Sequence, residues 1–188
     1  ACIANAIRNN LRYDNTIVLE NGYGISLRGL TLFAEKEYGW AGADPMDMAK
    51  KALDIILLKL EGQLMLRHPE YEMSDRLFLD KIDKEAATVH WEGKVYPLNN
   101  VDLPTLDPKH PYDLTKEEQI VVDDLRAAFL NSDRLQKHIS FLYEKGSMYR
   151  IYNGNLLYHG CVPLDTSGNF ERMQFDGRSY QGKEYLDY

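Results

Sequence analysis

The sequence predicts an α+β protein in which a helix-rich segment, residues 1–145, is followed by β-strands in residues 146–188. Apolar residues recur at helical spacing through most of the first segment. Turn dipeptides separate short β-like runs in the second segment. The composition, 44% hydrophobic and 27% charged, is that of an average globular protein. The 188 residues therefore suffice for about one domain with a core of its own.

Composition and charge exclude several classes of protein. The longest apolar run, Ile55–Leu58, is far too short to span a membrane, and the first residues lack the pattern of a signal peptide. A net charge of −7 argues against a general nucleic-acid binder. The two cysteines, Cys2 and Cys161, are expected to be free thiols in a reducing compartment. We therefore expect a cytoplasmic protein that binds neither nucleic acid nor membrane.

The helix-rich segment opens inside a helical pattern, because Ile3, Ile7 and Leu11 share one face. No capping residue precedes this face, which fits a truncated start and a frayed terminus equally well. Thr16–Leu19 then forms a β-like run before a turn. A short helix follows and is expected to end at Gly39.

A long central helix is predicted to begin at Asp44-Pro45, where an aspartate caps the helix and proline supplies the first helical φ. It ends at His68-Pro69, because the residue before a proline avoids the helical region. The helix carries a wide apolar stripe, which indicates that it is central. The stripe consists of Leu53, Ile55, Ile56, Leu57, Leu58, Leu60 and Leu64.

A small hairpin and a loop separate this helix from the next. Ala87–Trp91 and Lys94–Leu98 flank the turn Glu92-Gly93, which is typical of a hairpin over about 87–98. Four prolines lie between residues 97 and 111, interleaved with apolar residues. We expect a fixed, extended connection there rather than disorder.

Two further helices and two hairpins complete the chain. Thr115–Glu118 is a capping box that starts one helix. A short joint at Asn131-Ser132 leads to a second helix that ends at Gly146, and so short a joint favours an antiparallel pair. Beyond it, the predicted strands are Ser147–Tyr152, Leu156–His159, Arg172–Phe175 and Arg178–Gln181.

Several residues have two interpretations. Gly22, Gly24 and Gly29 lie where a phosphate-binding loop would, but their spacing is not a nucleotide fingerprint, so a turn and helix start is favoured. Nucleotide binding stays a weaker alternative. The pairs Glu117-Glu118 and Asp123-Asp124 indicate a solvated helix surface rather than metal ligands. His138 lies on an apolar stripe, which favours core or semi-buried packing over a site.

His159 is the main candidate for a functional residue. It stands at the end of an apolar strand and is followed by Gly160, so the strand fixes the ring and the glycine permits close approach. This placement fits a ligand or catalytic group, although a structural role is also open. Cys161 has no activating base nearby in the sequence and is interpreted as a structural thiol.

The segment 143–164, YEKGSMYRIYNGNLLYHGCVPL, resembles the class III fructose-1,6-bisphosphatases of bacteria. Two other stretches are similar to the same family: ANAIRNNLRYDNTIVLENGYGISLRGLTLFAEKEYG and KLEGQLMLRHPEYEMSDRLFLDKID. The family belongs to the calcineurin-like metallophosphoesterases. Their four-layered α/β core holds two metal ions between its sheets. One ligand of that superfamily is the histidine of a strand-end His-Gly motif, so the resemblance implies that His159 is a metal ligand.

The superfamily's other motifs are missing from this sequence: Asp-x-His, Gly-Asp-x-x-Asp, Gly-Asn-His-Asp/Glu and a later Gly-His. The stretches GADPMD and GNF are near misses only. Family members are also far longer. The resemblance therefore implies an interior segment of a larger enzyme. Residues 1–145 would be a mainly helical insertion or cap, and residues 146–188 would supply strands of the metallophosphoesterase core.

The function implied is that of a fragment of a metal-dependent fructose-1,6-bisphosphate 1-phosphatase, a hydrolase of gluconeogenesis that forms fructose 6-phosphate. The resemblance suggests Mn²⁺ in a two-metal site that is incomplete in this chain, with His159 as its one recognisable ligand. We expect the chain alone to be inactive. Its partners would be the substrate and either the remainder of its own polypeptide or a homo-oligomer partner. The alternative is a non-catalytic helical interaction module, which would expose no large apolar surface.

Overall fold

The computed structural model describes residues 1–13, 16–39 and 42–188. It divides the chain into two compact units: the helical unit, Ala1–Gln136, and the hairpin unit, Lys137–Tyr188. Helices and short antiparallel strands occur together, so the predicted α+β class is confirmed. None of the helices among the described residues is both long and apolar enough to cross a membrane.

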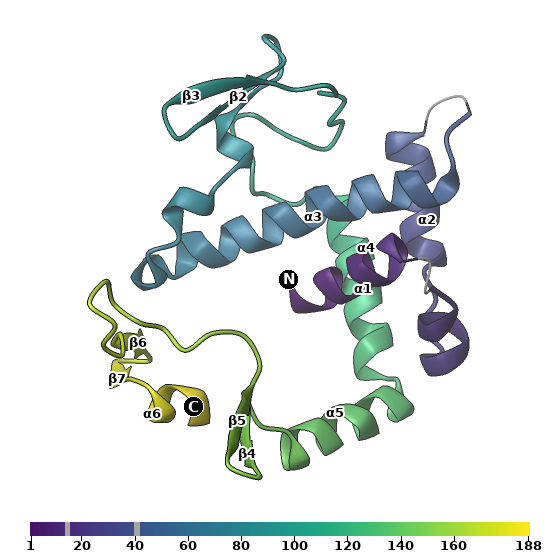
Figure 1. Cartoon of the computed structure of the whole chain (residues 1–188). Helices are drawn as coiled ribbons and strands as arrows, with labels where there is room; N and C mark the ends of the chain where they lie inside the picture. The colour runs from purple at the N-terminus through teal and green to yellow at the C-terminus, as the bar shows by residue number, and fades with distance from the viewer. Residues whose placement is uncertain (14–15, 40–41) are drawn as a thin grey trace. The chain divides into compact units, whose positions relative to one another are not determined.

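The helical unit consists of helices around a long central one, with a small sheet beside them (Figure 1). Its α-helices are α1 (Cys2–Arg12), α2 (Arg28–Tyr38), α3 (Pro45–Arg67), α4 (Lys116–Leu130) and the first turn of α5 (Asp133–Lys145). A π-helical turn η1 (Val18–Gly22) and the 3₁₀ turns η2 (Pro69–Tyr71), η3 (Ser74–Arg76) and η4 (Leu79–Lys81) connect them. The strands are β1 (Ile82–Asp83), β2 (Thr88–Trp91) and β3 (Lys94–Pro97).

Helix α3 is the centre of the core, as its wide apolar stripe predicts. The Asp44 side chain accepts a hydrogen bond from the Met46 N–H at 2.7 Å and caps the helix, which ends at His68 as expected. Helices α1 and α2 pack against α3, and α4 contacts both α1 and α2. Leu53 and Ile56 of α3 are almost completely buried at this junction. Burial of such side chains is the main term that stabilises the unit.

The small sheet has the order β1-β2-β3 and is antiparallel throughout. Glu92 and Gly93 both have positive φ, as a type I′ turn requires, so the predicted hairpin is confirmed. The connection that follows, residues 98–114, is named the strap. It contains no helix or strand, yet Leu103 and Leu106 are buried in the core. The strap is therefore a fixed connection, as its interleaved apolar residues predict.

A fully buried ion pair joins α3, α4 and the strap. Lys59 Nζ lies 2.7 Å from Glu118 Oε2, and it also donates to the Thr105 carbonyl at 2.7 Å. The same Glu118 oxygen accepts from the Thr115 N–H at 2.8 Å and completes the predicted capping box. Tyr38 extends the network, with its hydroxyl 2.6 Å from Thr105 Oγ1.

The prediction that Glu118 belongs to a solvated helix surface is wrong. Its carboxylate is buried because it compensates the buried ammonium of Lys59, and an unpaired charge in that position would be costly. The other members of the two acidic pairs are exposed as predicted, namely Glu117, Asp123 and Asp124.

The strap crosses α3 at a glycine. A Cβ atom at Gly62 would lie 2.1 Å from Tyr112 Cδ1, so only glycine allows the ring this close to the helix. Gln63 Nε2 donates to the Tyr112 carbonyl at 2.7 Å, and the Tyr112 hydroxyl donates to Asp80 Oδ1 at 2.5 Å. Burial, together with the Asp80 hydrogen bond, raises the pKa of Tyr112 to about 12. The phenol therefore stays neutral and keeps its donor role throughout the physiological range.

The hairpin unit contains two separate two-stranded sheets and a short helix (Figure 1). Its strands are β4 (Tyr149–Tyr152), β5 (Asn155–Tyr158), β6 (Met173–Phe175) and β7 (Arg178–Tyr180), and α6 (Lys183–Asp187) follows. The Phe175 ring at the end of β6 stacks with the rings of both Tyr185 and Tyr188. Both predicted hairpins are therefore confirmed.

Other predictions need correction or stay open. The β-like run Thr16–Leu19 is not a strand, since it leads into η1. There the Leu19 carbonyl accepts from the Ile25 N–H at 2.9 Å while the Leu19 side chain is buried. Strand β1 and helix α6 were not predicted, because they are too short to show periodicity. The antiparallel arrangement expected for α4 and α5 relates parts of different units and stays a prediction.

We expect Lys59→Met to lower the free energy of unfolding by about 3–5 kcal/mol, because it leaves the Glu118 carboxylate buried without its partner. Lys50→Met is the matched control on α3. It removes only a partly exposed pair with Asp47 at 3.4 Å, so its cost should stay below about 1 kcal/mol. Urea unfolding followed by circular dichroism measures both. Equal stability of the two variants would contradict the assignment.

We expect Gly62→Ala to destabilise the chain by about 1–3 kcal/mol, despite the better helix propensity of alanine, since the new methyl group overlaps the Tyr112 ring. Gly29→Ala is the control, because its Cβ would meet nothing nearer than Asp124 Oδ2 at 3.8 Å. Thermal unfolding compares the stability of the two variants. If the double variant Gly62→Ala/Tyr112→Ala loses as much stability from the Gly62 change as the single variant does, overlap with the Tyr112 ring is not the cause.

Candidate functional site

His159 follows β5 directly and is held by the β4–β5 ladder. The two strands pair antiparallel, with Tyr149 opposite Tyr158, and the His159 N–H donates to the Met148 carbonyl at 3.0 Å, which continues the register by one pair. Gly160 then turns the chain away with a φ of 87°. The backbone of His159 is thus fixed, while its side chain is exposed. Among the described residues, no hydrogen bond or ion pair engages the imidazole.

The register gives the β4–β5 hairpin two different faces. Residues opposite one another share a face, and successive residues alternate between faces. The first, called the apolar face, carries Tyr149, Ile151, Leu156 and Tyr158. The second, called the His159 face, carries Arg150, Tyr152, Asn155 and Leu157. Continuing the pairing adds Met148 and His159 to it.

Both faces of the hairpin are largely exposed, although Lys183 Nζ lies 5.6 Å from the centre of the Tyr149 ring. Ile151 is 68% exposed, and Tyr158 is 54% exposed. Throughout residues 137–188, all of which the structure describes, no hydrophobic side chain is buried. A two-stranded hairpin with bare apolar side chains is marginal in water. The hairpin unit therefore presents the kind of surface that packs against other polypeptide.

Metal binding needs more donors than this site supplies. A protein metal site ordinarily takes three or four ligands from the chain. In the described parts of the chain, no group of three or more histidine, cysteine, aspartate or glutamate residues is placed to hold a metal ion. His159 offers one imidazole. The residues present thus do not fit a resident metal by themselves.

The near-miss motifs of the sequence have structural roles. In GADPMD, Asp44 caps α3. In GNF, the Asn169 N–H and the Ser167 N–H both donate to Asp165 Oδ1, at 2.9 and 2.8 Å. The hydrogen bonds from Asn169 and Ser167 lower the pKa of Asp165 below its usual value. This carboxylate closes a turn and is thereby occupied.

The other candidate residues are placed as follows. Cys2 and Cys161 are both free and exposed, as expected of two reduced thiols. His138 is exposed on α5, so the expectation that it packs in or near a core is wrong. The reason is that the hairpin unit, to which it belongs, has no hydrophobic core.

The glycine segment does not have the geometry of a phosphate-binding loop. Gly22 ends a π-helical turn rather than following a strand. The Ser26 hydroxyl accepts from the Arg28 N–H at 3.2 Å, and Gly24, Ser26 and Gly29 line a pocket together with Asp124. A carboxylate facing this pocket repels phosphate. The turn interpretation is thus favoured over nucleotide binding.

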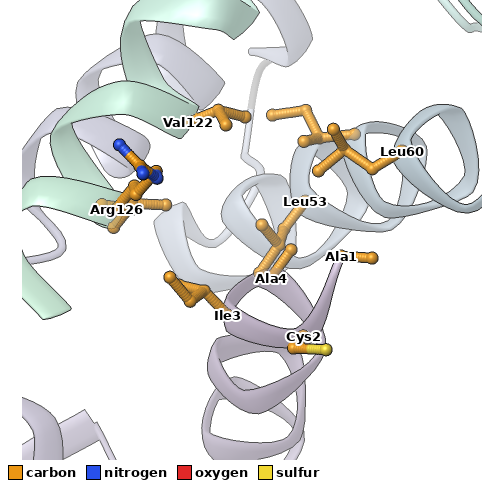
Figure 2. A pocket seen from close by; sticks show the side chains of 10 residues that line it. Ala1, Cys2, Ile3, Ala4, Leu53, Leu60, Val122 and Arg126 are labelled. Atoms are coloured by element: carbon orange, nitrogen blue, oxygen red, sulfur yellow. The ribbon is translucent and has the colours of Figure 1, made fainter. Parts of the chain in front are cut away.

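An apolar cavity lies inside the helical unit, between α1, α3 and α4 (Figure 2). Its volume is about 330 Å³. Arg126 supplies a charged side chain to its wall, and the other lining side chains carry no group suited to a phosphorylated sugar. They are Ala1, Cys2, Ile3, Ala4, Leu53, Ile56, Leu60, Val122 and Leu125.

Comparison with known proteins identifies the family. A family model described as Firmicute fructose-1,6-bisphosphatase matches residues 1–188. The chain belongs to this family. The class 3 fructose-1,6-bisphosphatases of Clostridium tetani, Clostridium novyi and Listeria innocua are 45%, 44% and 44% identical to it. These alignments cover 100%, 100% and 99% of this chain.

The chain spans only 31% of the length of each of these relatives. No solved structure matches it. The resemblance drawn from the sequence is thereby confirmed, including the much greater length of family members.

Two features of the structure were missed from the sequence, although each had a signal there. The signal for the buried pair of Lys59 and Glu118 was the position of Lys59, which interrupts the apolar stripe of α3. The signal for the shared face of Arg150 and His159 was the two-residue turn at Asn153-Gly154, which fixes the register of the strands on either side.

We expect the 188-residue chain alone to bind Mn²⁺ only weakly, without saturation at micromolar concentrations, since one imidazole is its single recognised ligand. Isothermal titration with MnCl₂ measures this, and His159→Ala is the control, which should give the same titration as the parent. Saturable binding that His159→Ala abolishes would show that the chain holds a metal site that the geometry does not reveal.

Proposed function

We propose that this chain is an interior segment of a cytoplasmic, Mn²⁺-dependent fructose-1,6-bisphosphate 1-phosphatase. The enzyme would hydrolyse a phosphomonoester to fructose 6-phosphate and phosphate as part of gluconeogenesis. Family membership supports the reaction, and the coverage of 31% supports a segment. The observation that carries the proposal is His159, an exposed histidine whose backbone is fixed at the end of a hairpin with largely exposed faces.

The contribution of His159 would be to present an imidazole from a fixed backbone position. The hydrogen bond from the His159 N–H to the Met148 carbonyl anchors the backbone, and Gly160 turns the chain away with a positive φ. Imidazole is a ligand of borderline divalent metals, and the carboxylates that Mn²⁺ prefers would come from elsewhere in the enzyme and complete the ligand set. In the complete enzyme, two metal ions would supply water activation and polarisation of the phosphoryl group, and His159 would be one of the residues that hold them.

The exposed apolar residues support packing against the remainder of the polypeptide. The hairpin unit buries no hydrophobic side chain, whereas those of the helical unit converge on α3. We infer that residues 146–188 contribute strands to the metallophosphoesterase core and that residues 1–145 form a cap or insertion. The two compact units divide within α5, close to this predicted boundary.

The alternative, a free-standing helical interaction module, has one observation in its favour. The helical unit has a continuous core and a buried ion pair of its own. A module of this kind does not account for residues 137–188, a unit that buries no hydrophobic side chain of its own. The enzyme segment is therefore the better-supported interpretation.

We expect His159→Ala, made in the complete polypeptide that carries these residues, to weaken Mn²⁺ binding at least about 10-fold. Even residues that only support metal ligands cost that much when they are changed. Equilibrium Mn²⁺ binding and Mn²⁺-dependent phosphate release measure the effect. Raising the Mn²⁺ concentration should restore part of the activity. His90→Ala is the matched control, since this exposed histidine lies on β2 of the helical unit. Unchanged Mn²⁺ affinity of His159→Ala would overturn the ligand assignment.

A further inference from the structure

We propose that the outer edge of β5 pairs with a further β-strand from the remainder of the polypeptide, while the outer edge of β4 stays unpaired. This inference rests on the proposed function, in which the chain is a segment of a longer enzyme, and it names the contact through which the hairpin joins the rest. The chain spans 31% of the length of its relatives, so most of the family's polypeptide lies outside it.

The register shows which backbone groups point outward from the hairpin. In an antiparallel pair of strands, opposed residues that exchange hydrogen bonds alternate with opposed residues that do not, and the latter direct their N–H and C=O groups to the outer edges. The His159 N–H donates to the Met148 carbonyl at 3.0 Å, so this pair is of the bonded kind. Counted from it, the residues with outward backbone groups are Tyr149 and Ile151 on β4 and Leu156 and Tyr158 on β5.

The β4 edge is partly occupied by residues of its own unit. The Tyr149 N–H, one of its outward donors, is bonded to Ser147 Oγ at 3.3 Å. Lys183 of α6 places its Nζ 5.6 Å from the centre of the Tyr149 ring. Arg150 adds a charge to the strand, and charged side chains are a common means of blocking an edge. A strand added to β4 would have to displace or accommodate these groups.

The β5 edge has none of these obstacles. Within the part of the chain that the structure describes, no side chain or other segment is bonded to the outward backbone groups of Leu156 and Tyr158. The strand, with the sequence NLLY, carries no charge. An uncharged edge with unpaired N–H and C=O groups is a template for another strand. A third strand also stabilises the hairpin, because two strands alone are marginal in water.

The chemistry of the added strand follows from the face that it extends. Side chains of neighbouring strands contact one another across the ladder, so the residues opposite Leu156 and Tyr158 would lie on the apolar face. Both side chains are about half exposed, at 52% and 54%. The partner is therefore an extended segment of the polypeptide with apolar residues at alternate positions, which cover them.

The test is amide hydrogen exchange in the complete polypeptide that carries these residues, resolved to single amides by mass spectrometry with electron-transfer fragmentation. After correction for intrinsic rates, the Leu156 and Tyr158 amides should exchange at least about 100-fold more slowly than the Ile151 amide. Ile151 is the matched control, because it lies directly opposite Leu156 and its N–H points to the other edge. Fast exchange at Leu156 and Tyr158, or equally slow exchange at Ile151, would overturn the inference.

A pair of proline variants separates strand pairing from simple burial. Leu156→Pro removes an outward donor on β5 and should speed exchange of the Tyr158 amide at least about 10-fold. Ile151→Pro removes the equivalent donor on β4 and should leave that rate unchanged. If Leu156→Pro does not fold, the parent exchange rates decide.

Two other results are distinguishable from the expected one. Protection of the β5 amides that disappears on dilution would overturn the inference, because the partner strand would then come from a second copy of the chain. Failure of the proposed function is a separate result, since exchange needs no turnover. A polypeptide that released no phosphate from fructose 1,6-bisphosphate could still protect the β5 edge.

Discussion

The helical unit depends on one buried ion pair. The Lys59 ammonium meets the Glu118 carboxylate at full burial, and it donates hydrogen bonds to two different segments, α4 and the strap. Desolvating two charges is expensive, and such a pair stabilises little compared with apolar residues of the same size. The pair instead constrains the position of α4 and the strap over α3, because both must meet the Lys59 ammonium. The capping box and the Tyr38 contact depend on that placement.

The two units differ in how far their apolar residues are buried. In the helical unit, apolar side chains from α1, α2, α3 and α4 form a continuous core. In the hairpin unit, local hydrogen bonds and stacked rings hold the hairpins while apolar residues stay exposed. The first unit has a hydrophobic core of its own and the second does not, which agrees with a chain that spans 31% of the length of its relatives.

The sequence alone correctly predicted the features that depend on residues close together in the chain. The cap at Asp44, the capping box at Thr115 and the turns at Glu92-Gly93 and Asp176-Gly177 are decided within a few residues. The burial of Glu118 was not accessible in this way, since it depends on a lysine far away in the chain. The prediction of a β-like run at Thr16–Leu19 was wrong for a similar reason, because burial of Leu19 in η1 overrode the local β propensity. The site was predicted only as far as His159, because the chain contains no further recognisable metal ligands among its described residues.

The bare hairpin has a consequence for how the protein is made. Residues 1–136 bury a hydrophobic core of their own, so this core can form once they have all left the ribosome. The β4–β5 hairpin has no such core, and its apolar side chains and strand edges stay exposed to other nascent chains. This exposure makes the polypeptide prone to aggregation. The charge of Arg150 then acts as a gatekeeper within the strand, in addition to any role in the finished enzyme.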